Sequence, residues 1–191
     1  MDYSIHITNY LNDLRSVLNT IDTAPISDFL NLMKNAAKNG RKVYICGNGG
    51  SASTASHFAG DYNKGLKSYN FDFICLSDNI PAMMAIANDI SYDEIFRYQI
   101  LNKIQKDDII IGISGSGNSR NVINALEYAT ECGAYTIGIT GYDGGTIKRI
   151  CDLSIHFPIN DMQIAEDLHL ILNHMTMRIL KEEKDNENFI H

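Results

Sequence analysis

The segment KVYICGNGGSAS, residues 42–53, decides the fold. Its first half is short and almost wholly apolar, which is typical of a strand buried on both faces in a parallel sheet. Its second half places three glycines and a serine where a strand ends and a helix begins. Glycines let the backbone approach a ligand closely, and a helix N-terminus offers free N–H groups to an anion. Alone, the segment fits either an anion site or a tight turn in which Ser51 caps the helix.

The same strand pattern recurs along the chain, with helical stretches between the strands. This order predicts repeated βα units and an α/β chain with a parallel sheet. Before the first strand, apolar residues at spacings of three and four predict two amphipathic helices that form a hairpin, and a long last helix follows Pro158. The predicted strands are 42–46, 73–77, 108–114, 134–140 and 152–157, and the predicted helices are 3–21, 27–40, 51–62, 81–104 with a break, 119–132, 145–150 and 162–183.

Length and composition limit the possible functions. The 191 residues suit one domain, 1–191, with its core at about 3–183 and a polar tail at 184–191 that we expect to fray. The net charge of −7 and the lack of a basic block argue against nucleic-acid binding. No apolar run is long enough for a membrane span, and the start of the chain does not resemble a signal peptide. We therefore expect a cytoplasmic protein.

A second glycine–serine loop, GSGNS, follows the strand at 108–114 and again precedes a helix. It carries the hydroxyls of Ser114, Ser116 and Ser119. Three hydroxyls and several backbone amides at a helix N-terminus suit the three acceptor oxygens of a phosphate monoester. The loop has no lysine, which argues against a nucleoside triphosphate. The two loops together predict a site for one phosphate on a small metabolite.

Two pairs of titratable residues lie on predicted helices. His57 and Asp61 are four residues apart and so share a helix face, and Glu166 and His174 lie on the last helix. Two imidazoles and two carboxylates could bind a divalent metal such as zinc, or could act as base and acid on a sugar. Eight helical residues span about 12 Å, so Glu166 and His174 meet at one ion only if their side chains reach toward each other.

Five segments in one order resemble the sugar-isomerase (SIS) domain, and within it the phosphoheptose isomerases: CGNGGSASTASHFAGDY, AIANDISYDEIF, GISGSGNSRNVINAL, GITGYDGG and the ExxHxxxxH of the last helix. The resemblance implies a three-layer, flavodoxin-like α/β fold with a five-stranded parallel sheet. It implies a homotetramer with active sites at subunit interfaces and a bound zinc ion. It also implies conversion of D-sedoheptulose 7-phosphate to D-glycero-D-manno-heptose 7-phosphate, for heptose incorporation into surface polysaccharide.

The resemblance also implies a role for each matching residue. It makes Asp61 the base and His174 the acid, with zinc held by His57, Asp61, Glu166 and His174. The substrate-binding positions fall on Asn48, Gly49, Gly50, Ser51, Asp61, Asn88, Asp89, Ser114, Gly115, Ser116, Ser119 and Glu166.

Several residues depart from the family pattern. Asp61 replaces a glutamate and is one methylene shorter, which withdraws its carboxylate by roughly 1.5 Å. Glu166 replaces a glutamine and adds a charge, Gly115 replaces a threonine, and Gly65 stands where an arginine is usual. Two alternatives stay open: an isomerase for another phosphosugar, and a non-catalytic SIS tetramer that regulates by binding a partner protein. The retained acid–base pair favours an enzyme.

Overall fold

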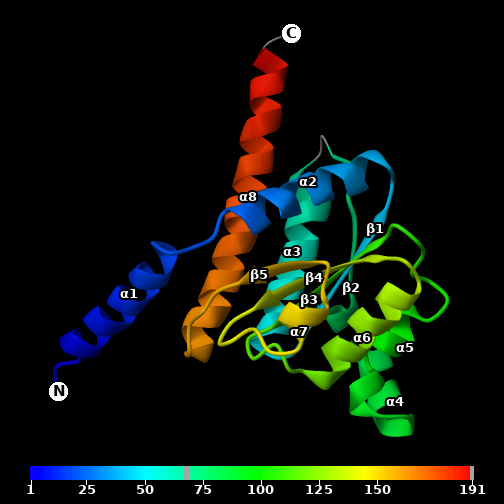
Figure 1. The fold of residues 1–191 in the computed structure, drawn as a ribbon, viewed down its shortest axis with the longest axis horizontal. Coiled ribbons are helices and arrows are strands. Elements are labelled where there is room, and N and C mark those ends of the chain that lie inside the picture. Colours follow the sequence, from blue (N-terminus) through cyan, green and yellow to red (C-terminus); the bar gives the residue numbers. More distant parts are fainter. Residues whose placement is uncertain (67–68, 190–191) are drawn as a thin grey trace.

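The computed structural model describes the backbone of residues 1–66 and 69–189 and side chains through residue 183. Its centre is a five-stranded sheet in which every neighbouring pair is parallel, in the order β2-β1-β3-β4-β5 (Figure 1). This is the flavodoxin-like order. The predicted α/β class and parallel sheet are confirmed. The strands are β1 (Lys42–Gly47), β2 (Asp72–Cys75), β3 (Ile109–Ser114), β4 (Tyr135–Thr140) and β5 (Leu153–His156).

Helices cover both faces of the sheet and give the predicted three layers. Along β1, Val43 and Ile45 contribute to one apolar core, whereas Tyr44 and Cys46 contribute to the other, because successive side chains point to opposite faces. The first core packs under α2 (Ala24–Lys38), α3 (Gly50–Gly65) and α8 (Met162–Phe189), and the second under α4 (Ile80–Asp89), α5 (Arg97–Ile100), α6 (Arg120–Glu131) and α7 (Ile147–Ile150).

The first helix, α1 (Ser4–Leu18), does not form the expected hairpin with α2. It leads away from the body of the molecule instead of folding back along α2 (Figure 1). The Tyr10 hydroxyl donates a hydrogen bond to the Asp167 carboxylate on α8, and most of the apolar side chains of α1 are exposed. A hairpin would have covered those side chains within one chain; here they remain available to another surface.

Several predicted boundaries are corrected. Helix α1 ends at Leu18, not at 21, α3 continues to Gly65, beyond 62, and α5 ends at Ile100, short of 104. Helix α2 begins at Ala24, not at 27, because Pro25 fits the first turn, where its missing N–H is not needed. Strand β2 ends at Cys75, and Leu76–Asp78 form a 3-10 turn. Helix α8 continues to Phe189, beyond the expected end at 183. Within the described part of the chain, none of the helices combines the length and apolar character that a membrane span requires.

Candidate functional site: two glycine–serine loops and a His–Asp–His group

The two glycine–serine loops lie side by side at one edge of the sheet. Strands β1 and β3 are hydrogen-bonded neighbours, and both loops follow their carboxyl ends. Helix α3 after β1 packs on one face of the sheet, whereas α6 after β3 packs on the other. This divergence creates the switch point where ligands bind in doubly wound folds.

The first loop is held by a hydrogen-bonded pair of amides. Asn48 and Asn121 each donate from Nδ2 to the Oδ1 of the other, at 2.9 Å, and the Tyr92 hydroxyl donates to Asn48 Oδ1 at 2.9 Å. Gly49 has φ +54°, a conformation that favours glycine. Ser51 is buried in the first turn of α3. Asn48 therefore joins the first loop to α6, and its side-chain oxygen is already engaged.

The second loop keeps its hydroxyls close together. Ser114 Oγ and Ser119 Oγ are 3.0 Å apart, and Ser114 Oγ accepts a hydrogen bond from the Gly117 amide. Gly117 has φ +66°, and a Cβ there would come within 2.0 Å of the Gly144 carbonyl oxygen. The loop is thus tightly packed, and its serine hydroxyls bond to one another and to the loop's own amides, since Ser116 Oγ accepts from the Asn118 amide at 3.2 Å. A phosphate oxygen could accept a hydrogen bond from each of the Ser114 and Ser119 hydroxyls in place of the bond between them.

A cavity of about 230 Å³ opens beside the first loop. Gly47, Asn48 and Gly49 line it together with Tyr92 and apolar residues of α4. The predicted pair Asn88 and Asp89 is found at the end of α4, where Asn88 donates to Asp89 at 2.8 Å. Neither of them lines this cavity, although the neighbouring Ala87 does. Their predicted contact with substrate stays a prediction.

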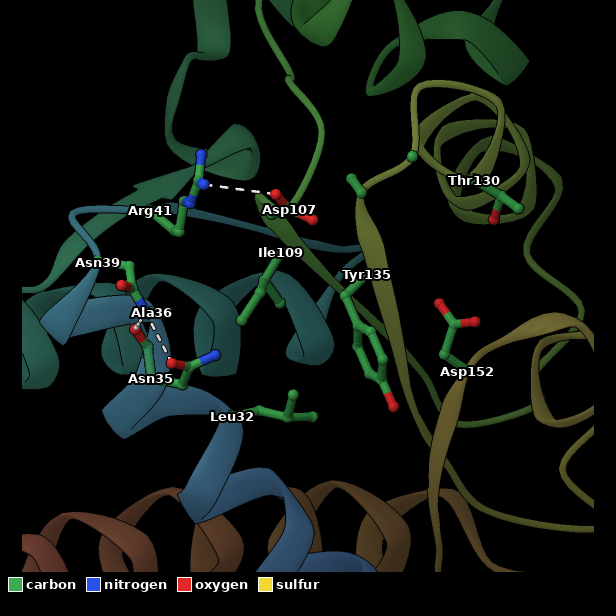
Figure 2. A pocket seen from close by; sticks show the side chains of 12 residues that line it. Leu32, Asn35, Ala36, Asn39, Arg41, Asp107, Ile109, Thr130, Tyr135 and Asp152 are labelled. Carbon is green, nitrogen blue, oxygen red and sulfur yellow. Dashed lines mark hydrogen bonds and ion pairs between the residues drawn. The ribbon is translucent and has the colours of Figure 1, made fainter.

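A second cavity, of about 620 Å³, lies at the opposite edge of the sheet (Figure 2). It is lined by residues at the amino ends of the strands, including Arg41, Tyr135 and Asp152, and the Arg41–Asp107 ion pair borders it at 3.4 Å. Ligands of such folds bind at the carboxyl ends of the strands. Despite its larger volume, this cavity is therefore not the candidate site.

The structure brings three of the four predicted metal ligands together. His57 Nε2 lies 3.1 Å from Asp61 Oδ2 on α3, and His174 Nε2 on α8 lies 3.1 Å from His57 Nε2. One donor atom from each residue lies within 4.8 Å of the other two. Both imidazoles are exposed and Asp61 is half-buried. We call these residues the His–Asp–His group; it presents an open, titratable face to solvent.

Glu166, the fourth predicted ligand, does not join this group. Its carboxylate lies against Gly50, where an added Cβ would come within 2.1 Å of Glu166 Oε2. Gly50 is the first residue of α3, so the carboxylate lies beside the N-terminal amides of that helix, where a negative charge is favoured. Glu166 thus belongs to the loop end of α3, and the His–Asp–His group lies about two turns further along.

Comparisons with known proteins identify the family of the chain. A family model described as the SIS domain matches residues 8–141. The chain is 37% identical over 181 residues to a phosphoheptose isomerase of Aliarcobacter butzleri, covering 93% of this chain and 96% of that protein. The chain belongs to the phosphoheptose isomerase family of SIS domains. The resemblance seen in the sequence motifs is confirmed.

Solved structures share the fold. Phosphoheptose isomerase GmhA from Neisseria gonorrhoeae is similar with a TM-score of 0.85 and 30% identity, over 94% of this chain and 96% of that one. A phosphoheptose isomerase from Francisella tularensis is similar with a TM-score of 0.86 and 25% identity, over 95% of this chain and 100% of that one. Both likenesses extend over nearly the whole chain and are therefore not limited to the glycine-rich loops.

Three polar residues near the site were not predicted from the sequence. Asn121 and Tyr92 bond to Asn48, and Asn173 donates from Nδ2 to Asp61 Oδ2 at 2.8 Å. Asn173 is fully buried on α8. An asparagine inside the apolar run LHLILNHM was the one available hint, because helix interiors disfavour that residue.

A buried imidazole lies between Glu166 and His174 on α8. His169 is fully buried, and its ring centre is 5.8 Å from that of Phe157. Burial lowers the pKa of His169 to about 4, although the Thr140 backbone opposes the shift. His169 is thus neutral at pH 7 and helps to pack α8 against the sheet.

Proposed function

We propose that this protein is an aldose–ketose isomerase that converts D-sedoheptulose 7-phosphate to D-glycero-D-manno-heptose 7-phosphate. One observation carries the proposal: His57 and Asp61 of α3 meet His174 of α8, about two turns along α3 from the glycine–serine loop at its N-terminus. A phosphate anchor and an acid–base group at that separation suit a phosphosugar whose reacting carbons are at the other end. We further propose that the reaction is cytoplasmic and supplies heptose for surface polysaccharide.

The loops would hold the phosphate. The hydroxyls of Ser51, Ser114, Ser116 and Ser119 and the amides at the start of α3 and α6 provide donors without a fixed positive charge. Anchoring the phosphate fixes the far end of the sugar and limits the positions that C1 and C2 can adopt. The residues of α3 beyond its first turn would then face the reacting carbons.

Isomerisation moves a proton between C1 and C2 through a cis-enediol. Asp61 would take the proton from C1 of the ketose and return it to C2, while His174 would move a proton between the two oxygens. Neither side chain is fully buried, so substrate can reach both from solvent. His57, between them, lies 3.1 Å from each and would hold the Asp61 carboxylate in place.

The donors of the His–Asp–His group fit a zinc ion. Two imidazole nitrogens and one carboxylate oxygen are ligands that zinc prefers, and three protein ligands leave a position for substrate. When bound, zinc would polarise the sugar oxygens and stabilise charge on the enediol. We propose His57, Asp61 and His174 as the ligands, with Glu166 remaining at Gly50.

We also propose a homotetramer with sites near its interfaces. Helix α1 exposes Ile5, Ile7 and Leu11 as it leads away from the body, and exposed apolar surface of this kind is normally covered by another chain. Light scattering coupled to gel filtration should therefore give four times the monomer mass of 21.3 kDa. A monomer at micromolar concentration would refute this part of the proposal.

The deciding experiment is an isomerase assay with sedoheptulose 7-phosphate, following the aldose product, on zinc-loaded and chelator-treated protein. Turnover that disappears on chelation and returns with zinc supports the proposal. If the sugar phosphate raises the melting temperature without turnover, the loops bind phosphate and the chemistry serves another phosphosugar or a regulatory role. If it neither turns over nor stabilises the protein, the proposed function is wrong.

A further inference from the structure

The two oxygens of the Asp61 carboxylate have different surroundings. Oδ2 lies 3.1 Å from His57 Nε2 and accepts a hydrogen bond from Asn173 Nδ2 at 2.8 Å. In the part of the chain that the structure describes, no hydrogen bond reaches Oδ1. One oxygen is therefore held between two helices, and the other is free. A carboxylate that acts both at a metal site and as a base needs one oxygen held in place and the other available to take a proton.

The burial of Asn173 argues that its amide serves the carboxylate and not the core. The side chain is fully buried on α8, and its Oδ1 has no hydrogen-bond partner among the described residues. Turning the amide over would place its oxygen against the Asp61 oxygen, so the donating orientation is required. A buried acceptor without a partner destabilises a fold, whereas a leucine of similar shape would not. Stability alone does not account for an asparagine here.

We propose that Asn173 is a positioning residue that fixes the rotation of the Asp61 carboxylate, so that Oδ1 is the oxygen that moves the proton. This inference rests on the proposed function. Asp61 is short, so its carboxylate stays close to α3, and an amide on the facing helix meets it there. Asn173 directly precedes His174, so one turn of α8 sets the base and carries the acid. Small rotations of a catalytic group strongly reduce proton transfer.

The first test compares Asn173→Leu with Tyr62→Phe. Tyr62 donates to Thr176 at 2.9 Å, so the control also removes a buried hydrogen bond between α3 and α8, but it leaves the Asp61 carboxylate untouched. We expect Asn173→Leu to lower kcat about 10- to 100-fold, the size typical for partners of site ligands, with KM changed less than about threefold. The control should change kcat less than about twofold. Equal kcat values for the two variants would overturn the inference.

The second test asks whether the effect passes through Asp61. A longer side chain in Asp61→Glu carries the carboxylate beyond the Asn173 amide, by roughly 1.5 Å. In that background, Asn173→Leu should cost less than about threefold in kcat. A full 10- to 100-fold loss in both backgrounds, the size typical for partners of site ligands, would show that Asn173 acts elsewhere and would refute the positioning role.

Two further readouts separate this inference from the proposed function. Calorimetric titration with zinc should show about tenfold weaker binding by Asn173→Leu than by Tyr62→Phe, whether or not the wild type isomerises the sugar. A crystal structure of Asn173→Leu should show the Asp61 carboxylate rotated. If that carboxylate keeps its wild-type position, the inference is wrong even if the enzyme is an active phosphoheptose isomerase.

Discussion

The glycine–serine loops and the His–Asp–His group are built in different ways. Each loop is formed by a few consecutive residues between a strand and a helix, and its geometry depends on backbone conformations such as that of Gly117. The His–Asp–His group instead joins residues 117 positions apart, because His57 lies on α3 and His174 on α8. The loops, formed by neighbouring residues, are suited to binding a phosphate. The His–Asp–His group, formed by two helices, can place an acid on α8 opposite a base on α3.

This difference should separate the kinetic effects of substitutions. Changes in the loops should mainly raise KM, because they weaken the hold on the phosphate in ground state and transition state alike. Changes in the His–Asp–His group should mainly lower kcat, because proton transfer occurs only on the way to the enediol. A variant that mixes the two effects would show that the regions are coupled.

The largest effect is expected for Asp61→Asn. The amide keeps the shape of the side chain but cannot accept a proton, so kcat should fall about 10³-fold. The sugar phosphate should still raise the melting temperature by the wild-type amount, because the loops are intact. Steady-state kinetics and a thermal-shift titration measure the two quantities. Unchanged activity would remove Asp61 from the role of base.

The next effect concerns the packing that connects the two regions. Burial lowers the pKa of His169 to about 4, so the folded protein resists protonation that the unfolded chain accepts below about pH 6.5. The unfolded state then binds more protons between these values, and stability falls as pH drops from about 6.5 to about 4. This residue should account for about 3 kcal/mol of that loss.

The measurement is urea unfolding of the wild type and His169→Leu across this range. The leucine variant lacks the titrating ring, so its stability should fall less steeply, and the difference between the two curves isolates His169 from the carboxylates. Parallel curves would show that the imidazole gains a partner or water when the protein folds in solution.

A smaller effect is expected for Ser119→Ala. Its hydroxyl lies 3.0 Å from that of Ser114 and is one of the donors available to the phosphate. Losing one hydrogen bond to a charged group should raise KM about tenfold, with kcat within about twofold. Thr146→Val is the control, because it removes a hydroxyl contact to Asn118 in the same loop without touching the serines. A fall in kcat alone would contradict the division between the regions.

The loops could be predicted from the sequence because their signals are local. An apolar run that ends in glycines and serines already predicts a strand, a turn and the start of a helix. Both β1 and β3 show this pattern. The shared helix face of His57 and Asp61 followed from their spacing. The parallel sheet and the family were likewise readable, since five motifs occur in one order.

Contacts between distant segments could not be predicted in this way. Helices α3 and α8 lie so that Gly50 meets Glu166 and His57 meets His174. That offset comes from packing, and it places Glu166 apart from the other three residues, whereas the sequence showed only that eight helical residues separate Glu166 from His174. The role of Asn173 is hidden for the same reason, because its partner is 112 residues away. The direction of α1 likewise depends on contacts with distant segments, such as that between Tyr10 and Asp167.

Glu166→Gln sharpens the comparison, because it decides to which region residue 166 belongs. At Gly50 the Glu166 carboxylate is close to the loop that would receive the phosphate. Both groups are negative, so removing the charge of Glu166 weakens a repulsion through solvent and should lower KM about threefold. Zinc affinity should change less than about twofold, because the other three residues form their group without it. Asp161→Asn is a matched control, since it removes a charge from the start of α8, where Asp161 accepts from the Ile164 amide. Zinc binding weakened about tenfold or more by Glu166→Gln would instead make Glu166 the fourth ligand, and α8 would have to shift along α3 when the metal binds.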